Sequence, residues 1–129
     1  MVMITGIHHV TAITADAQKN IDFYTGVLGL RLVKLTVNFD DPSSYHLYYG
    51  DAGGSPGSII TFFSWPGAHE GRKGPPQVIS TAYAAPRGSL EHWRSRLSGA
   101  AASKRFDDDV LSFTDPDGLR LGRTVPRTL

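Results

Sequence analysis

The stretch "GIHHVTAITADAQKNIDFYTGVLG" (residues 6–29) contains the first two elements of the fold. Its opening, "GIHHVTAIT" (6–14), is rich in β-branched residues, which favour a strand. Asp16 stands where the N-cap of a helix is expected, and apolar residues at three- and four-residue spacing continue to Leu28. Gly29 then supplies a stop signal. The stretch therefore predicts a strand followed by an amphipathic helix.

The same order of elements occurs twice along the chain. Three more strand candidates complete the first half: "LRLVKLTVNF" (30–39), "SYHLYYG" (44–50) and "SIITFFSW" (58–65). A linker rich in Gly and Pro follows at residues 66–76. Beyond it, a strand candidate (77–85) precedes Ser89, which can cap a helix at 90–99. The last strand candidates are "KRFDDD" (104–109), "VLSFTD" (110–115) and "LRLGRTV" (119–125).

Short motifs align between the two halves, for example "NFDD" (38–41) with "RFDD" (105–108). These matches indicate an internal duplication of a βαβββ unit. We predict one α+β domain over residues 1–129, with unit one at about 4–65 and unit two at about 77–126. Helices are expected on one face of each mixed, mostly antiparallel sheet, while the other faces form a half-open barrel around a cavity.

Composition excludes several classes of function. The 13 basic and 12 acidic residues leave a net charge of +1, so the chain has no electrostatic field that would attract nucleic acid. The sequence contains no cysteine, which excludes disulfides, thiolate nucleophiles and thiolate metal ligands. No apolar run approaches the ~18 residues of a membrane span. We therefore expect a cytoplasmic globular domain.

Two adjacent histidines, His8 and His9, lie in the first strand candidate. Neighbouring residues of a regular strand point to opposite faces, so the two imidazoles are not expected to share one metal. Val10 and Ala12 suit a helix-covered face, which would leave His9 on the cavity face with Thr11. His8 would then be half exposed or act as an orienting neighbour. Spacing alone leaves the choice of face open.

Several motifs, together with the duplicated unit, resemble a known family. "HHVTAIT" (8–14), "NIDFYTGVLGLRLV" (20–33) and "FTDPDGLRL" (113–121) are similar to the vicinal oxygen chelate superfamily. That superfamily includes glyoxalase I, bleomycin-resistance proteins and extradiol dioxygenases. Residues 6–66 resemble most the opening of the N-terminal module of hydroquinone-type ring-cleaving dioxygenases.

The resemblance implies a set of metal-ligand positions. In those longer, two-module enzymes, two imidazoles and one carboxylate hold Fe(II), and the N-terminal module supplies only the second histidine of the pair, here His9. Across the superfamily, ligand positions map to His9, Thr61, Ser80 and Gly122. Only His9 offers a strong donor. The resemblance therefore implies that this chain alone binds Fe(II) or another divalent metal weakly or not at all.

Two functions follow from the resemblance. In the first, His9 contributes to a dioxygenase site that another chain or module completes with His and Glu, for O2-dependent cleavage of a dihydroxylated aromatic ring. In the second, the chain is a metal-independent binding protein of the bleomycin-resistance type. Phe63 and Trp65, with Thr11, would line its pocket for a small aromatic molecule, although core packing explains the two aromatic residues equally well. In both cases we expect a homodimer.

Two further features leave alternatives open. His46 shares a strand face with Tyr48, where it would be either an acid or base in the pocket or a histidine on a solvated strand surface. The run Asp107–Asp109 lacks the oxygen-rich spacing of a calcium loop, so we expect an acidic turn there.

Overall fold

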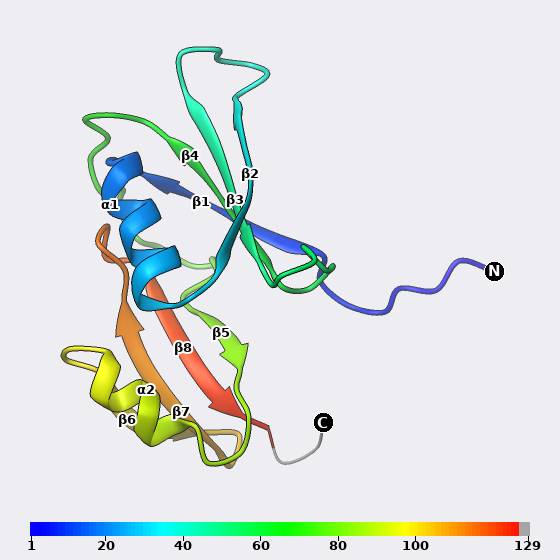
Figure 1. Cartoon of the computed structure of the whole chain (residues 1–129), viewed down its shortest axis with the longest axis vertical. Helices are drawn as coiled ribbons and strands as arrows, with labels where there is room; N and C mark the ends of the chain where they lie inside the picture. The colour runs from blue at the N-terminus through cyan, green and yellow to red at the C-terminus, as the bar shows by residue number, and fades with distance from the viewer. Residues whose placement is uncertain (127–129) are drawn as a thin grey trace. The chain divides into compact units, whose positions relative to one another are not determined.

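The chain folds into two compact units, Met1–Glu70 and a second that begins at Gly71. The computed structural model describes residues 1–126 (Figure 1). The division between the units falls within the linker expected at residues 66–76. Because the placement of one unit relative to the other is not determined, the half-open barrel and the single module over 1–129 stay predictions.

The first unit is a four-stranded mixed sheet with one helix. In chain order its elements are β1 (His9–Thr14), α1 (Ala17–Ile21), the π-helical segment η1 (Asp22–Val27), β2 (Arg31–Val37), β3 (Tyr45–Gly50) and β4 (Ile59–Ser64). The strands are ordered β1-β4-β3-β2 across the sheet. β1 is parallel to β4, and the other neighbours are antiparallel. A parallel pair requires a crossover connection, which here contains the helix and the other two strands.

The second unit repeats this topology. Its elements are β5 (Thr81–Ala84), α2 (Leu90–Arg96), β6 (Ala101–Arg105), β7 (Asp108–Thr114) and β8 (Arg120–Val125). The strand order is β5-β8-β7-β6, with β5 parallel to β8 and the remaining pairs antiparallel. The predicted duplication of a βαβββ unit is therefore confirmed. Among residues 1–126, no helix is long and apolar enough to cross a membrane.

The predicted start and stop of the first helix are both confirmed. An Asp16 carboxylate oxygen accepts the Lys19 backbone N–H at 3.1 Å, and Gly29 adopts a φ of 71° just after the helix. Between these ends the helix widens into η1, where the Leu28 N–H donates to the Phe23 carbonyl at 3.0 Å. This five-residue spacing is that of a π-helix rather than an α-helix.

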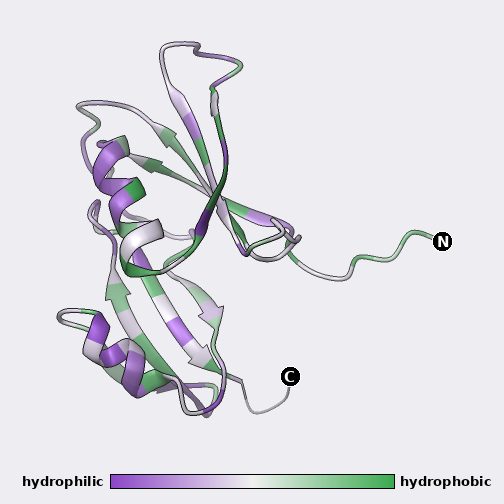
Figure 2. Cartoon of the chain, in the orientation of Figure 1, coloured by the Kyte–Doolittle hydropathy of each residue, from purple (hydrophilic) through white to green (hydrophobic). Residues whose placement is uncertain are grey.

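Aromatic rings form the core of the first unit. Tyr24 of η1 is fully buried, with its ring centroid 5.1 Å from that of Tyr49 on β3 and 4.8 Å from that of Phe62 on β4. The Tyr49 hydroxyl donates to the Asn20 side-chain oxygen at 2.6 Å within this core. Figure 2 shows hydrophilic and hydrophobic residues alternating along α1, as expected for a helix with one buried face.

The second unit has its own core, with a charged residue inside it. Leu111, Phe113 and Leu121 are buried on the face toward α2. Arg123 is 8% exposed, and its guanidinium carbon lies 4.0 Å from the ring centroid of Trp93 on α2. Stacking of a guanidinium on an indole ring stabilises a buried arginine.

Two local predictions in the second unit were wrong. The segment "KRFDDD" (104–109) is not a strand, because Phe106 and Asp107 have φ values of 49° and 66° and form the two-residue turn between β6 and β7. Hairpin turns of this kind need a positive φ at both central residues. Ser89 precedes α2 but does not cap it, since its hydroxyl donates to the Pro86 carbonyl at 2.6 Å. Of the expected acidic turn, only Asp107 is in the turn.

The hydrogen bond between Tyr49 and Asn20 gives a stability prediction. Replacing Tyr49 with Phe retains the ring packing but leaves the buried Asn20 oxygen without this donor, which costs about 1–3 kcal/mol. Urea unfolding should show a lower midpoint for Tyr49→Phe. The control Tyr45→Phe, at a side chain that is 53% exposed on the same strand, should unfold like the wild type. Equal midpoints for both variants would contradict this account of the core.

Candidate functional site

One face of the first sheet is not covered by the helix of its own unit and carries polar and aromatic side chains. Paired residues on neighbouring strands point to the same side of a sheet. Thr11, Thr61 and Tyr48 are in register across β1, β4 and β3, and His46 is in register with Phe63. We call this the open face. Its members from these three strands include His9, Thr11, Ile13, His46, Tyr48, Thr61 and Phe63.

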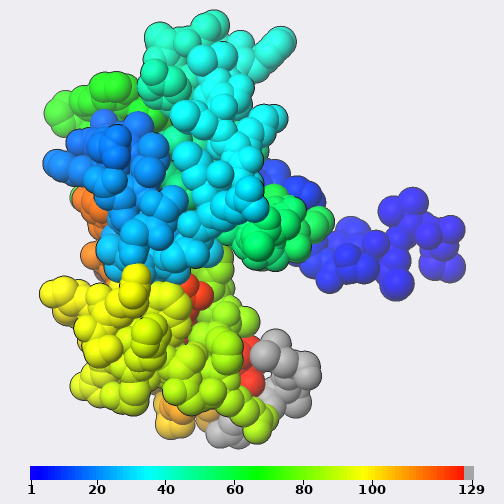
Figure 3. All heavy atoms as spheres, viewed as in Figure 1, coloured from blue at the N-terminus to red at the C-terminus, as the bar shows by residue number. Residues whose placement is uncertain are grey.

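His9 lies on the open face, together with Thr11 and Ile13 of the same strand. Val10, Ala12 and Thr14 on the opposite face are less exposed than His9 and Thr11. The N-terminal residues before the strand project from the first unit (Figure 3). His9 is therefore a surface-accessible imidazole at the beginning of β1.

His8 contacts His9, in keeping with the alternative in which His8 is an orienting neighbour. Their Nδ1 atoms lie 3.1 Å apart, with the rings edge-on at 5.3 Å between centroids. His8 precedes β1, so strand alternation does not govern it, and its carbonyl accepts the Gly57 N–H at 2.7 Å. A hydrogen bond at this distance joins one protonated and one bare Nδ1 atom. This contact involves Nδ1 of His9, whereas Nε2, the other nitrogen of the ring, takes no part in it.

A hydrogen-bonded series of side chains crosses the open face. The hydroxyls of Thr11 and Thr61 are 2.8 Å apart, and the Thr61 hydroxyl is 3.1 Å from His46 Nε2. The Tyr48 hydroxyl lies 3.0 Å from His46 Nδ1. The His46 ring also stacks on Phe63, with centroids 4.1 Å apart. These contacts argue against a fully solvated strand surface for His46, and its action as an acid or base stays a prediction.

The surroundings of His46 favour its neutral form. Burial lowers the pKa of His46 below its ordinary value, and electrostatic interaction with Lys34 and His9 lowers it further. Lys34, on β2, also has its ammonium nitrogen 5.3 Å from the ring centroid of Tyr48. At neutral pH the His46 ring is therefore neutral, with one of its two hydrogen-bonded nitrogens protonated and the other bare.

Two of the four expected ligand positions lie in the second unit. Ser80 immediately precedes β5, and Gly122 is the third residue of β8, as Thr61 is the third residue of β4. Gly122 is paired with Ala82, and a Cβ atom added to it would lie 3.5 Å from the Cβ of that alanine. A Cβ atom there would thus be in ordinary van der Waals contact with its neighbours, the nearest being Val110 Cγ1 at 3.4 Å. The role of these positions in metal binding stays a prediction.

The donor set does not fit a complete divalent-metal site. Among residues 1–126, no three His, Cys, Asp or Glu side chains lie close enough together to hold a metal ion. Thr61 is 1% exposed, and its hydroxyl contacts Thr11 and His46. Since Fe(II) sites of the facial-triad type need two imidazoles and a carboxylate, these residues alone supply too few donors.

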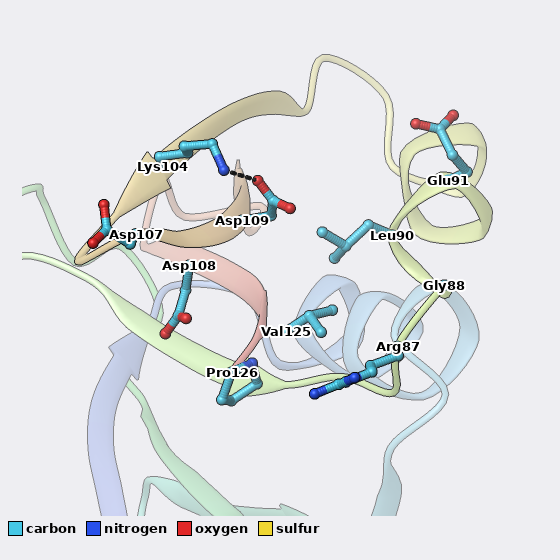
Figure 4. Close-up of a pocket in the computed structure, with 10 residues that line it drawn as sticks. All are labelled: Arg87, Gly88, Leu90, Glu91, Lys104, Asp107, Asp108, Asp109, Val125 and Pro126. Carbon is cyan, nitrogen blue, oxygen red and sulfur yellow. Dashed lines mark hydrogen bonds and ion pairs between the residues drawn. The ribbon is translucent and has the colours of Figure 1, made fainter. Parts of the chain in front are cut away.

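A hollow of about 520 Å³ lies in the second unit (Figure 4). Thr11, Phe63 and Trp65, the expected pocket residues, do not line it. Phe63 is half-buried against His46, and Trp65, just beyond β4, is 42% exposed. The hollow is lined by Arg87, Gly88, Leu90, Glu91, Lys104, Asp107, Asp108, Asp109, Val125 and Pro126.

The acidic residues of this hollow do not form a metal site. Figure 4 shows that the carboxylates of Asp107, Asp108 and Asp109 do not converge on one point. Asp109 accepts a hydrogen bond from Lys104 Nζ at 3.0 Å, which uses one of the three charges. The open face of the first sheet is therefore the better candidate for a functional site.

Comparison with known proteins identifies the family. The model of the "Glyoxalase/Bleomycin resistance protein/Dioxygenase superfamily" matches residues 6–122. The chain belongs to this superfamily. The glyoxalase-like fold expected from the sequence is thus confirmed. A fosfomycin resistance protein, FosX from Listeria monocytogenes, shares this fold with a TM-score of 0.68 at 16% identity, and the match covers 98% of this chain and 96% of FosX.

More similar members of the superfamily carry names that describe ring cleavage. MhqO of Bacillus subtilis, named as a ring-cleaving dioxygenase, is 53% identical over 120 residues, which are 90% of this chain and 38% of that protein. Chlorohydroquinone/hydroquinone 1,2-dioxygenase of Sphingobium indicum is 37% identical over 88% of this chain and 38% of its own length. The resemblance to this enzyme class is confirmed.

A solved structure shows the same relationship. A dioxygenase structure from Bacillus subtilis matches with a TM-score of 0.90 at 51% identity, over 94% of this chain and 40% of that one. The chain therefore spans about two-fifths of the length of such relatives. It corresponds in sequence and fold to one part of a larger dioxygenase.

Sequence reasoning missed the interactions of the open face. It placed His46 beside Tyr48 but not next to Thr61, because that contact depends on the register between β3 and β4. Lys34 was also not predicted as a neighbour of this cluster. It is paired with Tyr48 across β2 and β3 and therefore points to the same side of the sheet. Register is not encoded in the spacing of residues along one strand.

The lowered pKa of His46 predicts a pH-dependent stability. Because the folded state holds this proton less tightly than the unfolded state, His46 destabilises the fold as the pH falls below its ordinary pKa of 6.5. Between about pH 7.5 and pH 5.5, the unfolding free energy should fall more for the wild type than for His46→Gln. Urea unfolding at both pH values measures this difference.

A matched control separates His46 from the other histidines. His69 is exposed in the linker, so His69→Gln should keep the pH dependence of the wild type. If His46→Gln and the wild type lose the same unfolding free energy on acidification, the assignment of this effect to His46 is wrong.

Proposed function

We propose that this chain is the part of a ring-cleaving dioxygenase that contributes His9 to a metal site. A histidine and a glutamate of another chain or module complete the site, for O2-dependent cleavage of a dihydroxylated aromatic ring. The support is the similarity of the chain to about two-fifths of proteins named for this activity. The observation that carries the proposal is the place of His9 on the open face, beside the Thr11 hydroxyl of the same strand.

The contact with His8 prepares His9 for such a role. Ligating histidines usually have their second ring nitrogen hydrogen-bonded, which fixes the tautomer and the ring orientation. The Nδ1 atoms of His8 and His9 provide that bond at 3.1 Å, so Nε2 of His9 is the donor atom in this proposal. Iron, when held by the completed site, would supply the binding and activation of oxygen.

The remaining residues of the open face bind and orient the substrate in this proposal. The ring of Phe63 lies against His46, whose ring centroid is 4.2 Å from that of Tyr48. These rings offer an apolar surface against which a flat aromatic molecule can pack, next to the hydroxyl of Thr11.

Iron content under anaerobic conditions tests the proposal. The isolated chain should hold far less than one Fe(II) per chain, because it supplies only the His9 donor. Co-expression with the rest of MhqO, beyond the part that matches this chain, should give a complex that binds Fe(II) and consumes oxygen with hydroquinones. His9→Ala should abolish both in that complex, whereas His92→Ala, at an exposed residue of α2, should abolish neither.

Two results would reject the proposal. One is tight, stoichiometric Fe(II) in the isolated chain. The other is a co-expressed complex whose iron content does not change in the His9→Ala variant.

The alternative is a metal-independent homodimer that binds a small aromatic molecule in the cytoplasm. Its support is the lack of a strong donor at Thr61, Ser80 and Gly122. Under this alternative, aromatic ligands should raise the melting temperature equally with and without EDTA. A chelator-sensitive melting temperature would count against it, and sedimentation analysis would show whether the chain is a dimer.

A further inference from the structure

The hydrogen bonds across the open face constrain one another. Thr61 is 1% exposed, and its single hydroxyl proton has two neighbours, Thr11 Oγ1 at 2.8 Å and His46 Nε2 at 3.1 Å. A hydroxyl donates one hydrogen bond, so Thr61 accepts from one of these neighbours while it donates to the other. If both neighbours donated, the buried proton of Thr61 would have no acceptor among them, which is costly.

A neutral His46 permits two arrangements. With the imidazole proton on Nε2, His46 donates to Thr61 and Thr61 donates to Thr11, so the Thr11 proton is directed elsewhere. With the proton on Nδ1, each of these hydrogen bonds runs in the opposite direction. Thr61 then donates to His46 Nε2, and Thr11 donates its proton to Thr61. The tautomer of His46 therefore decides whether Thr11 can offer a hydrogen-bond donor to a ligand.

Tyr48 selects between the two arrangements. Its hydroxyl lies 3.0 Å from His46 Nδ1. A phenol is acidic for a hydroxyl and donates strongly, and a bare imidazole nitrogen is a good acceptor. Tyr48 therefore donates to Nδ1, which assigns the imidazole proton to Nε2. The pKa of His46, lowered by burial and by electrostatic interaction with Lys34 and His9, agrees with a ring that carries one proton only.

We infer that Tyr48 and His46 are positioning residues that make the Thr11 hydroxyl an outward hydrogen-bond donor. The open face then favours aromatic ligands that bring an oxygen without a proton, such as a phenolate, over ligands that can only donate at that point. The inference deepens the proposed function and rests on it for the identity of the substrate class. The direction of the hydrogen bonds rests on the distances across the open face and on the donor strength of the Tyr48 phenol.

Nitrogen NMR of the histidine side chains in the full, metal-free chain tests the tautomer. His46 should show a protonated Nε2 and a bare Nδ1, and Tyr48→Phe should convert it to a mixture of tautomers. Tyr45→Phe, at an exposed tyrosine of the same strand, should leave the His46 signals unchanged. A protonated Nδ1 in the wild type, or unchanged signals in Tyr48→Phe, would overturn the inference.

Ligand binding by the same metal-free chain tests the consequence. At pH 8 the wild type should bind 4-nitrophenolate in preference to 4-nitroaniline, which has a similar shape but presents N–H donors. Tyr48→Phe and Thr11→Val should each reduce that preference roughly tenfold. Equal binding of the two compounds by the wild type would overturn the inference. Since neither measurement involves iron, failure here is distinct from failure of the His9 metal-site proposal.

Discussion

The parallel pairing of β1 with β4 is the constraint on which the candidate site depends. It places Thr11 in register with Thr61, and the antiparallel partner β3 then adds Tyr48 to the same row. The aromatic core around Tyr24 holds the helix on the other side of the sheet. One face of the sheet therefore packs against the helix. The open face carries polar side chains that form hydrogen bonds to one another across three strands.

Much of this architecture could be predicted from the sequence. Local features were predicted correctly, because they depend on residues close together in the chain. Examples are the helix cap at Asp16 and the helix stop at Gly29. The contact of His8 with His9 was only one of two alternatives for His8, because the choice depends on where β1 begins. The turn at Phe106 and Asp107 was missed for a different reason, since neither residue is the glycine that usually marks a positive φ.

The open face also explains why a member of the glyoxalase/bleomycin resistance protein/dioxygenase superfamily can retain a shaped site without a complete donor set. Among residues 1–126, the imidazoles of His8 and His9 meet no third metal-binding group. The residues nearby are instead joined to one another by hydrogen bonds. The arrangement of these side chains is therefore set by the sheet itself.

The second sheet has the same backbone topology but carries other side chains at the corresponding positions. The row Thr11, Thr61 and Tyr48 of the first sheet corresponds by register to Ala82, Gly122 and Ser112 of the second. Strand order and polarity are nevertheless identical in the two sheets. The scaffold therefore does not depend on this row for its fold, and the two halves of a duplicated unit can carry different side chains there.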